Sequence, residues 1–196
     1  SGAAGLGAKV ALIEGHKMGG DCLNYGCVPS KAFLKSAHLA SAITHAETFG
    51  LSATLQDVDL SKVMDHVRAV IKEIEPHDSV ERYEGLGVDV IQEKGSFIDA
   101  HTIRAGDRIL TGKHIVIATG STAMVPPIKG LDTVPYLTNH TLFNETQLPK
   151  HLIVLGAGPI GLELGQGFRQ LGSAVTLIDM LPQLFAKDDP EVGPLL

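Results

Sequence analysis

The sequence is poor in several residue types that mark common classes of protein. Its 196 residues include no tryptophan, two cysteines, and 16 lysines and arginines against 22 acidic residues, for a formal net charge of −6. A protein that binds nucleic acid or an anionic membrane surface needs a basic face, so we expect neither partner. No apolar run is long enough to span a membrane. Because two cysteines and no signal peptide are typical of a reducing compartment, we expect a cytoplasmic protein.

The residues that are abundant allow a folded core. Apolar residues make up 44% of the chain and 22 residues are glycine, which indicates a sizeable core with many tight turns. The length suits one large domain or two small ones.

Both cysteines lie in one short stretch, with four residues between them. Positions five apart on a regular helix rise about 7.5 Å, whereas a disulfide needs Cα atoms within roughly 7 Å of each other. Cys22 and Cys27 can therefore meet only where the backbone bends, and Asn24 and Gly26 tolerate such a bend. A helix predicted from about Pro29 would favour a thiolate at Cys27. The stretch thus predicts a redox-active dithiol.

Two other interpretations of the cysteines stay open. The pair could form a structural disulfide, although stable disulfides are rare in the cytosol. It could also form half of a zinc site, but no second Cys pair or His pair stands nearby at ligand spacing. We therefore expect no metal site.

A dinucleotide-binding fingerprint lies near the end of the chain. The pattern predicts a buried strand, a glycine turn, a helix and a second strand, at residues 152–155, Gly156-x-Gly158-x-x-Gly161, 162–171 and 174–178. The glycines let the backbone approach a pyrophosphate at the helix N-terminus, and Asp179, 21 residues after Gly158, can accept from ribose hydroxyls. An acid there would repel a 2′-phosphate, so NAD is favoured over NADP. A βαβ unit that binds nothing is the alternative.

The start of the chain has an incomplete version of the same fingerprint. Gly2 and Gly5 match its last two glycines, residues 10–13 match the second strand, and Glu14 matches the acid at its end. Gly161 and Asp179 are 18 residues apart, whereas Gly5 and Glu14 are only 9 apart. We interpret the difference as about two and a half helical turns that are missing from the sequence; a natural deletion is the alternative.

Between the two fingerprints the patterns predict helices and short strands. The helices cover residues 60–74 and 78–83, and the short strands cover 88–92, 96–98, 102–104 and 108–110. Residues 114–121 then read as a buried strand that ends in a glycine turn at Gly120.

The cysteine stretch resembles a known active-site signature. Residues 19–31 are similar to the Gly-Gly-Thr-Cys-x-Asn-x-Gly-Cys-x-Pro-Ser-Lys run of the pyridine nucleotide-disulfide oxidoreductases, flavoproteins that include dihydrolipoamide dehydrogenase, glutathione reductase and mercuric reductase. Asp21 stands where threonine is commoner in that family.

The resemblance implies roles for individual residues. It implies that Cys22 attacks the substrate, that Cys27 is the thiolate against the flavin, and that Lys31 lies near the reactive flavin nitrogen. Glu163 would lie near the nicotinamide and pair with Lys31, the two charges being held away from water. The implied FAD-binding residues are Gly2, Gly5, Glu14, Gly20, Asp21, Ala118, Thr119 and Gly120, and the implied NAD-binding residues are Gly156, Gly158, Gly161 and Asp179.

The resemblance also implies a fold and an activity. The fold is α/β, with two Rossmann-like, three-layer units for FAD and NAD(P) and a small antiparallel β-meander, in truncated form. Residues 1–146 would be the first portion of an FAD-binding domain and residues 147–196 the opening βαβ of an NAD-binding domain. The implied activity is FAD-dependent, NAD-linked oxidation and reduction of a dithiol or disulfide substrate, in a protein that is homodimeric at full length. The alternatives are a mercuric-reductase-like enzyme that reduces a metal ion and a catalytically incomplete nucleotide-binding fragment.

Overall fold

The computed structural model describes residues 1–182, 184, 189 and 191, and its contacts divide the chain into two compact units. Unit 1 contains residues 1–28 and 69–140, and unit 2 contains residues 29–68 and 141–196. Two long helices, α3 (Cys27–Thr44) and α4 (Leu60–Ile74), each have residues in both units. The predicted boundary at residue 146 stays a prediction, and residue 183 and most later residues of the region 147–196 lie outside the described part.

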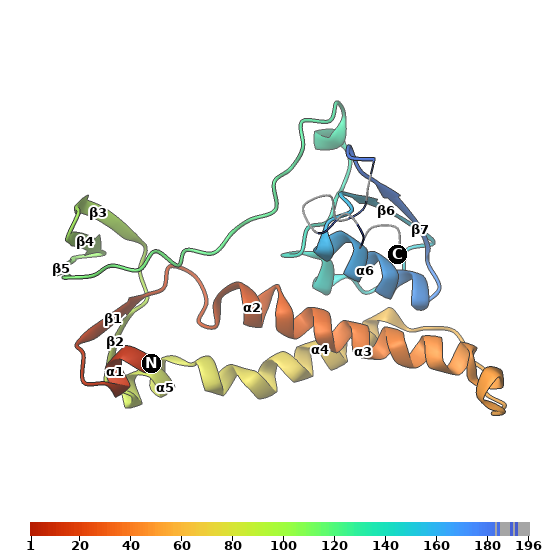
Figure 1. Ribbon diagram of the computed structural model, residues 1–196, viewed down its shortest axis with the longest axis horizontal. Helices are drawn as coiled ribbons and strands as arrows, with labels where there is room; N and C mark the ends of the chain where they lie inside the picture. The colour runs from red at the N-terminus through yellow and green to blue at the C-terminus, as the bar shows by residue number, and fades with distance from the viewer. Residues whose placement is uncertain (183, 185–188, 190, 192–196) are drawn as a thin grey trace. The chain divides into compact units, whose positions relative to one another are not determined.

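Unit 1 is built on two parallel strands, β1 (Val10–Ile13) and β2 (Val88–Ile91), which pair in register over their whole length (Figure 1). The short helix α1 (Gly2–Gly5) precedes β1. The helix predicted over 78–83 is a 3₁₀ turn, η2 (Glu75–Asp78), followed by α5 (Val80–Gly85). Ser79 separates them, because its hydroxyl accepts the Arg82 amide at 3.3 Å as an N-cap.

A three-stranded antiparallel meander follows β2. It consists of β3 (Gly95–Asp99), β4 (Thr102–Ala105) and β5 (Arg108–Thr111), close to the predicted strands. Arg108 joins β5 to β2 through two hydrogen bonds to the Asp89 carboxylate, at 3.0 and 2.5 Å. The bond from Arg108 lowers the pKa of Asp89 below its ordinary value.

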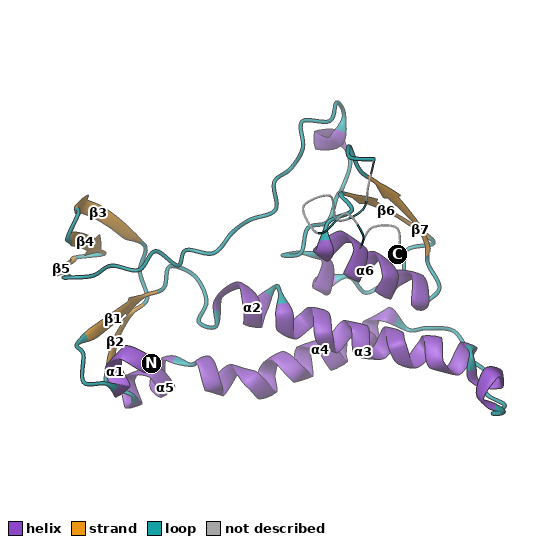
Figure 2. Ribbon diagram, in the orientation of Figure 1, coloured by secondary structure: helices purple, strands orange, loops and turns teal. Residues whose placement is uncertain are grey.

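The prediction of a buried strand over residues 114–121 is wrong. In the described part of the chain no strand pairs with this segment, and Val116 and Ile117 are 86% and 70% exposed. A continuous apolar run is typical of a strand that has other strands on both sides, but the run itself does not show whether such strands are present. Figure 2 shows the chain from β5 to η4 (Leu142–Asn144) as loop, apart from the single turn η3 (Leu131–Thr133).

Unit 2 contains the predicted strand–helix–strand unit near the end of the chain. Strands β6 (His151–Leu155) and β7 (Ala174–Ile178) are parallel, and helix α6 (Pro159–Gln170) connects them. Gly165 faces the sheet, since a Cβ there would lie 3.5–3.6 Å from Val175, Leu177 and Val154. The prediction that residues 152–155 are buried is wrong. Leu152 and Val154 are half-buried, and Ile153 and Leu155 are 57% and 43% exposed.

The core of unit 2 is aromatic. The Phe33 ring of α3 is fully buried, with its centroid 4.9 Å from that of Phe168 in α6 and 6.5 Å from that of Phe143. A Cβ at Gly167 would lie 2.5 Å from the Phe33 ring, so α6 approaches α3 too closely for any side chain at that position. Helix α4 adds Leu60, Met64 and Val67 to the buried residues. After α3 comes a 3₁₀ turn, η1 (Ala46–Phe49).

None of the helices in the described residues is both long and apolar enough to cross a membrane.

Candidate functional site

The two cysteines, both in unit 1, lie at the break between helices α2 and α3. Cys22 is in α2 (Gly20–Asn24), and Cys27 is the first residue of α3. The predicted bend is therefore present, at Tyr25 and Gly26. Gly26 is needed for space, since a Cβ would lie 3.0 Å from the Asp21 carbonyl oxygen. Asn24 stabilises the turn, because its side-chain amide donates to the carbonyls of Met18 and Gly20 at 3.0 and 2.9 Å.

The two sulfur atoms are thiols in contact with each other. Both residues are exposed, and the Cys22 side chain is hydrogen-bonded to that of Cys27. This hydrogen bond, and secondly burial, raises the pKa of the Cys22 thiol above its ordinary value. Cys27 stands at the N-terminus of an 18-residue helix, where the helix dipole favours negative charge. The geometry thus favours Cys22 as the thiol that keeps its proton.

Asp21 connects the dithiol turn to a distant segment. Its carboxylate accepts the Ser121 backbone amide at 2.9 Å, 100 positions along the chain. Gly120 has a left-handed φ of +72°, and a Cβ there would lie 2.6 Å from Asp21 Oδ2. Gly120 is thus required for this contact, whereas Ala118 and Thr119 are exposed. The flavin contacts expected of these residues stay a prediction.

Lys31 and Glu163 meet within unit 2, as predicted, although they are 132 positions apart. The Lys31 ammonium donates to Glu163 Oε1. The pair is not held away from water, because the two side chains are 67% and 32% exposed. Exposed ion pairs stabilise a fold by about 0–1 kcal/mol, so the contact follows from the close packing of α3 and α6 at Gly167 and does not cause it.

The second fingerprint has the geometry of a pyrophosphate-binding turn. Gly156 follows β6 with φ +105°, and Gly158 is the N-cap of α6. A Cβ at Gly161 would lie 2.1 Å from the Gly156 carbonyl oxygen, so only glycine allows this approach of helix to turn. Open space surrounds Gly156 and Gly158 at the position of a Cβ. The turn therefore leaves room for a ligand at the start of a 12-residue helix.

Asp179 closes the other side of this turn. Its carboxylate accepts the amides of Ala157 at 2.6 Å and Leu181 at 2.8 Å, and the Ala157 bond is the main cause of its lowered pKa. The acid is therefore ionised and lies at the end of β7, beside the glycine turn.

The fingerprint at the start of the chain, in unit 1, has a different geometry from the one at residues 156–161. Gly2 and Gly5 lie in a helix of four residues, and a Cβ at either would meet nothing within 4 Å. Glu14 follows β1, and its carboxylate accepts the His16 amide at 2.8 Å. Gly20 has φ +56° with open space around it. The acid and the open glycines fit a dinucleotide, but a helix this short supplies little dipole for a pyrophosphate.

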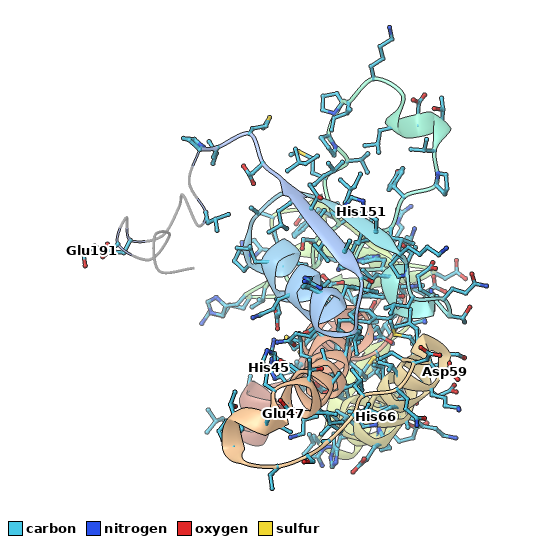
Figure 3. The ribbon with its side chains drawn as sticks, turned by 90° about the vertical axis from the view of Figure 1, so that its right-hand side faces the viewer. His45, Glu47, Asp59, His66, His151 and Glu191 are labelled. Atoms are coloured by element: carbon cyan, nitrogen blue, oxygen red, sulfur yellow. The ribbon has the colours of Figure 1, made fainter. Side chains whose placement is uncertain are left out.

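Other titratable side chains of unit 2 do not converge on a metal site. Figure 3 shows His45 and Glu47 near η1, Asp59 and His66 on or beside α4, and His151 on β6, with no common centre. Among the described residues there is no group of three or more His, Cys, Asp or Glu side chains that could hold a metal ion.

Sequence reasoning missed three features of the site. The hydrogen bond from the Ser121 amide to Asp21 could not be predicted, because every residue type except proline has the same backbone amide. Gly167 looked like one helical glycine among several. Tyr25, one of the four residues between the cysteines, had a visible signal as an aromatic in a turn, and it stacks on His140 with ring centroids 4.3 Å apart.

Together these features define a class of protein: an α/β fold with a glycine-fingerprint βαβ unit and a dithiol at a helix junction. Over residues 1–196 the chain matches the family model described as pyridine nucleotide-disulphide oxidoreductase. The chain belongs to this family, as the cysteine signature predicted.

Relatives with two different names are similar to the chain. A mercuric reductase of Bacillus cereus is 36% identical over 191 residues, 97% of this chain and 30% of the relative. A dihydrolipoyl dehydrogenase of Acholeplasma laidlawii is 35% identical over 195 residues, 97% of this chain and 58% of the relative. The chain thus spans between about a third and three fifths of these relatives.

A solved structure has the same fold. The HOCl-induced flavoprotein disulfide reductase RclA from Escherichia coli matches with a TM-score of 0.79 and 28% identity, over 98% of this chain and 41% of that one. Its Cu(II) complex matches with a TM-score of 0.80. The predicted fold class, α/β with Rossmann-like units and a small meander, is confirmed.

Proposed function

We propose that this chain is part of an FAD-dependent, NAD(H)-linked dithiol oxidoreductase similar to dihydrolipoamide dehydrogenase. The observation that carries the proposal is the contact between the thiols of Cys22 and Cys27 at the junction of α2 and α3. Sulfur atoms that already contact each other need little movement to form a disulfide. Membership of the family supports the assignment of redox chemistry to this pair.

The chemistry of the pair is a two-electron exchange. When a substrate dithiol is oxidised, the Cys22–Cys27 bond breaks, two protein thiols form, and the substrate gains a disulfide and loses two protons. In this direction a substrate thiolate attacks the Cys22 sulfur and Cys27 leaves, whereas in the reverse direction Cys22 attacks the substrate disulfide. We assign the exchange with substrate to Cys22 and the thiolate facing the flavin to Cys27. The raised pKa of Cys22 supports Cys27 as the thiol that ionises first. A bound flavin would supply a two-electron carrier between the dithiol and the pyridine nucleotide.

Lys31 and Glu163 have supporting roles in this proposal. Lys31 would place a positive charge beside the reactive nitrogen of the flavin, where charge becomes negative on reduction. Glu163, in contact with it, would orient the ammonium and border the nicotinamide. We further propose that residues 1–146 and 147–196 are the beginnings of the FAD-binding and NAD-binding domains, and that the full-length protein is a homodimer.

The preference for NAD over NADP rests on Asp179. Its ionised carboxylate beside the glycine turn would accept ribose hydroxyls and repel a 2′-phosphate. We expect the full-length protein to use NADH with about tenfold or higher kcat/KM than NADPH, and Asp179→Arg to shrink that ratio. An unaltered protein that prefers NADPH would contradict the assignment.

Reduction of a metal ion is the second candidate function. Mercuric reductases stand beside dihydrolipoyl dehydrogenases among the relatives, at 36% and 35% identity. Purified full-length protein should show the visible absorbance of a flavin and should oxidise NADH with lipoamide faster than with Hg²⁺ in excess thiol. Faster turnover with Hg²⁺ would replace the leading proposal by the second candidate. A protein without flavin absorbance or turnover would be a nucleotide-binding fragment.

A further inference from the structure

Tyr25, one of the four residues between the two cysteines, is held by a distant segment of unit 1. The Tyr25 ring stacks on His140 with an interplanar angle of 17°, and the Tyr25 carbonyl accepts the side-chain amide of Asn139 at 3.4 Å. Two residues that precede Tyr25 in the sequence also contact it. The Tyr25 hydroxyl is 3.0 Å from His16 Nε2, and the Lys17 ammonium lies 5.7 Å from the centroid of the Tyr25 ring. We call these five residues the Tyr25 cluster.

His140 contributes to the cluster by the stacking of its ring on Tyr25. Its Nε2 atom is buried without a hydrogen-bond partner in the described structure. A buried polar atom without a partner is costly, so another interaction keeps the ring in place. The stack on Tyr25, with centroids 4.3 Å apart, is the contact available to do this.

The cluster fixes the backbone on which the sulfur atoms depend. Tyr25 is the C-cap of α2, two residues before Cys27, and is the non-helical link between the two cysteine-bearing helices. Four residues separate the sulfurs, so a shift of Tyr25 changes the distance from Cys22 to Cys27. Asn24 and Gly26 shape the turn from within, whereas Tyr25 connects it to residues more than 100 positions away.

We propose that Tyr25, held by His140 and Asn139, is a positioning residue that keeps the two sulfur atoms within bonding reach and so lowers the reduction potential of the Cys22–Cys27 pair. The inference rests on the proposed function, because it assigns a redox cycle to that pair. Holding two thiols together raises their effective concentration, and this favours the disulfide over the dithiol. The cluster therefore acts on an equilibrium and not only on folding.

The test measures that equilibrium without relying on turnover. Full-length protein is equilibrated with glutathione redox buffers, in which the Cys22–Cys27 bond breaks, two protein thiols form, and two glutathione thiols become one disulfide. The thiols are then alkylated and counted by mass. Tyr25→Leu and His140→Leu should each shift the equilibrium about tenfold toward the dithiol, which corresponds to about 30 mV.

Four further variants separate positioning from general damage. Tyr25→Phe and His140→Phe keep the stack and should stay within about threefold of the unaltered protein. The double variant Tyr25→Leu/His140→Leu should shift the equilibrium no further than either single change, because both remove one interaction. Tyr136→Leu is the matched control, since Tyr136 is 48% exposed in the same long segment, and it should shift nothing.

The outcomes distinguish this inference from the proposed function. If Tyr25→Leu does not fold, as judged by circular dichroism, His140→Leu changes the same stack from outside the turn. Equilibria of His140→Leu and of any folded Tyr25→Leu within twofold of the unaltered protein would overturn the inference and leave the dithiol intact. An unaltered protein whose cysteines never interconvert between thiol and disulfide would instead overturn the proposed function.

Discussion

One unit of this chain contains a complete glycine fingerprint and the other an incomplete one, in different structural settings. In unit 2 a 12-residue helix follows the glycines, and the last glycine touches the turn so closely that a Cβ would lie 2.1 Å from a carbonyl oxygen. In unit 1 the helix has four residues, and the corresponding Gly5 has nothing within 4 Å. The last position of the motif thus requires glycine only when the helix that follows packs against the strand and turn.

The largest expected effect comes from the last glycine of the unit 2 fingerprint. Gly161→Ala forces a methyl group into the backbone of the Gly156 turn, and we expect a loss of about 3 kcal/mol in stability together with weaker NADH binding. Gly5→Ala, the matched change in unit 1, should alter stability by less than about 0.5 kcal/mol. Thermal unfolding and NADH titration of both variants measure the contrast. Equal effects of the two changes would show that the comparison of the units is wrong.

A second pair of glycines sharpens the account of helix packing within unit 2. Gly167→Ala would place a methyl group 2.5 Å from Phe33, which is fully buried between other aromatic rings and cannot move away easily. We expect it to destabilise by about 1–2 kcal/mol. Gly165→Ala meets only ordinary contacts at 3.5–3.6 Å, so its gain in helix propensity should stabilise by about 0.5–1 kcal/mol. Opposite signs in thermal unfolding are the expected result, and a stabilising Gly167→Ala would contradict it.

The thiol pair of unit 1 gives a pH-dependent prediction. The hydrogen bond to Cys27 is the first cause of the raised pKa of Cys22, so Cys27→Ala should lower that pKa and move the alkylation profile of Cys22 to lower pH. At neutral pH the rate of Cys22 alkylation by iodoacetamide should rise severalfold, because the thiolate is the reacting form. Lys35→Ala, an exposed change further along α3, is the control. A slower or unchanged rate in Cys27→Ala would argue against the contact between the thiols.

The smallest stability effect belongs to the ion pair of unit 2. Lys31→Met removes an exposed charge, so the free energy of unfolding should change by less than about 1 kcal/mol. If Lys31 has the proposed role, the rate of flavin reduction by NADH should nevertheless fall by about tenfold or more, since electrostatic stabilisation is lost. Rapid-mixing absorbance measures that rate. An unchanged rate would remove Lys31 from the mechanism, whatever its contact with Glu163.

The sequence predicted the helices, strands and turns that depend on residues close together in the chain. The helix predicted from about Pro29, which the structure shows as α3, the meander, the βαβ unit and the bend between the cysteines were all predicted from periodicity and turn residues. The segment 114–121 failed, because a strand requires partners that its own residues do not specify.

Of the contacts between residues far apart in the sequence, one was predicted and two were not. The Lys31–Glu163 contact followed from the family resemblance, but its exposure depends on how much of the surrounding surface is covered, which neither residue encodes. The bond from the Ser121 amide to Asp21 and the stack of His140 on Tyr25 join segments about 100 positions apart or more. Both contacts depend on the path of a long loop, and the sequence of that loop has no periodic pattern from which its path could be predicted.

The redox cycle of the two cysteines is tested most directly by counting thiols. Full-length protein is oxidised, treated with NADH under anaerobic conditions, unfolded in alkylating reagent and weighed. The account predicts that alkylation of Cys22 and Cys27 appears only after NADH is added, and that it disappears when a disulfide substrate is added next. Cysteines that are alkylated to the same extent before and after NADH would contradict the claim that this pair carries the electrons.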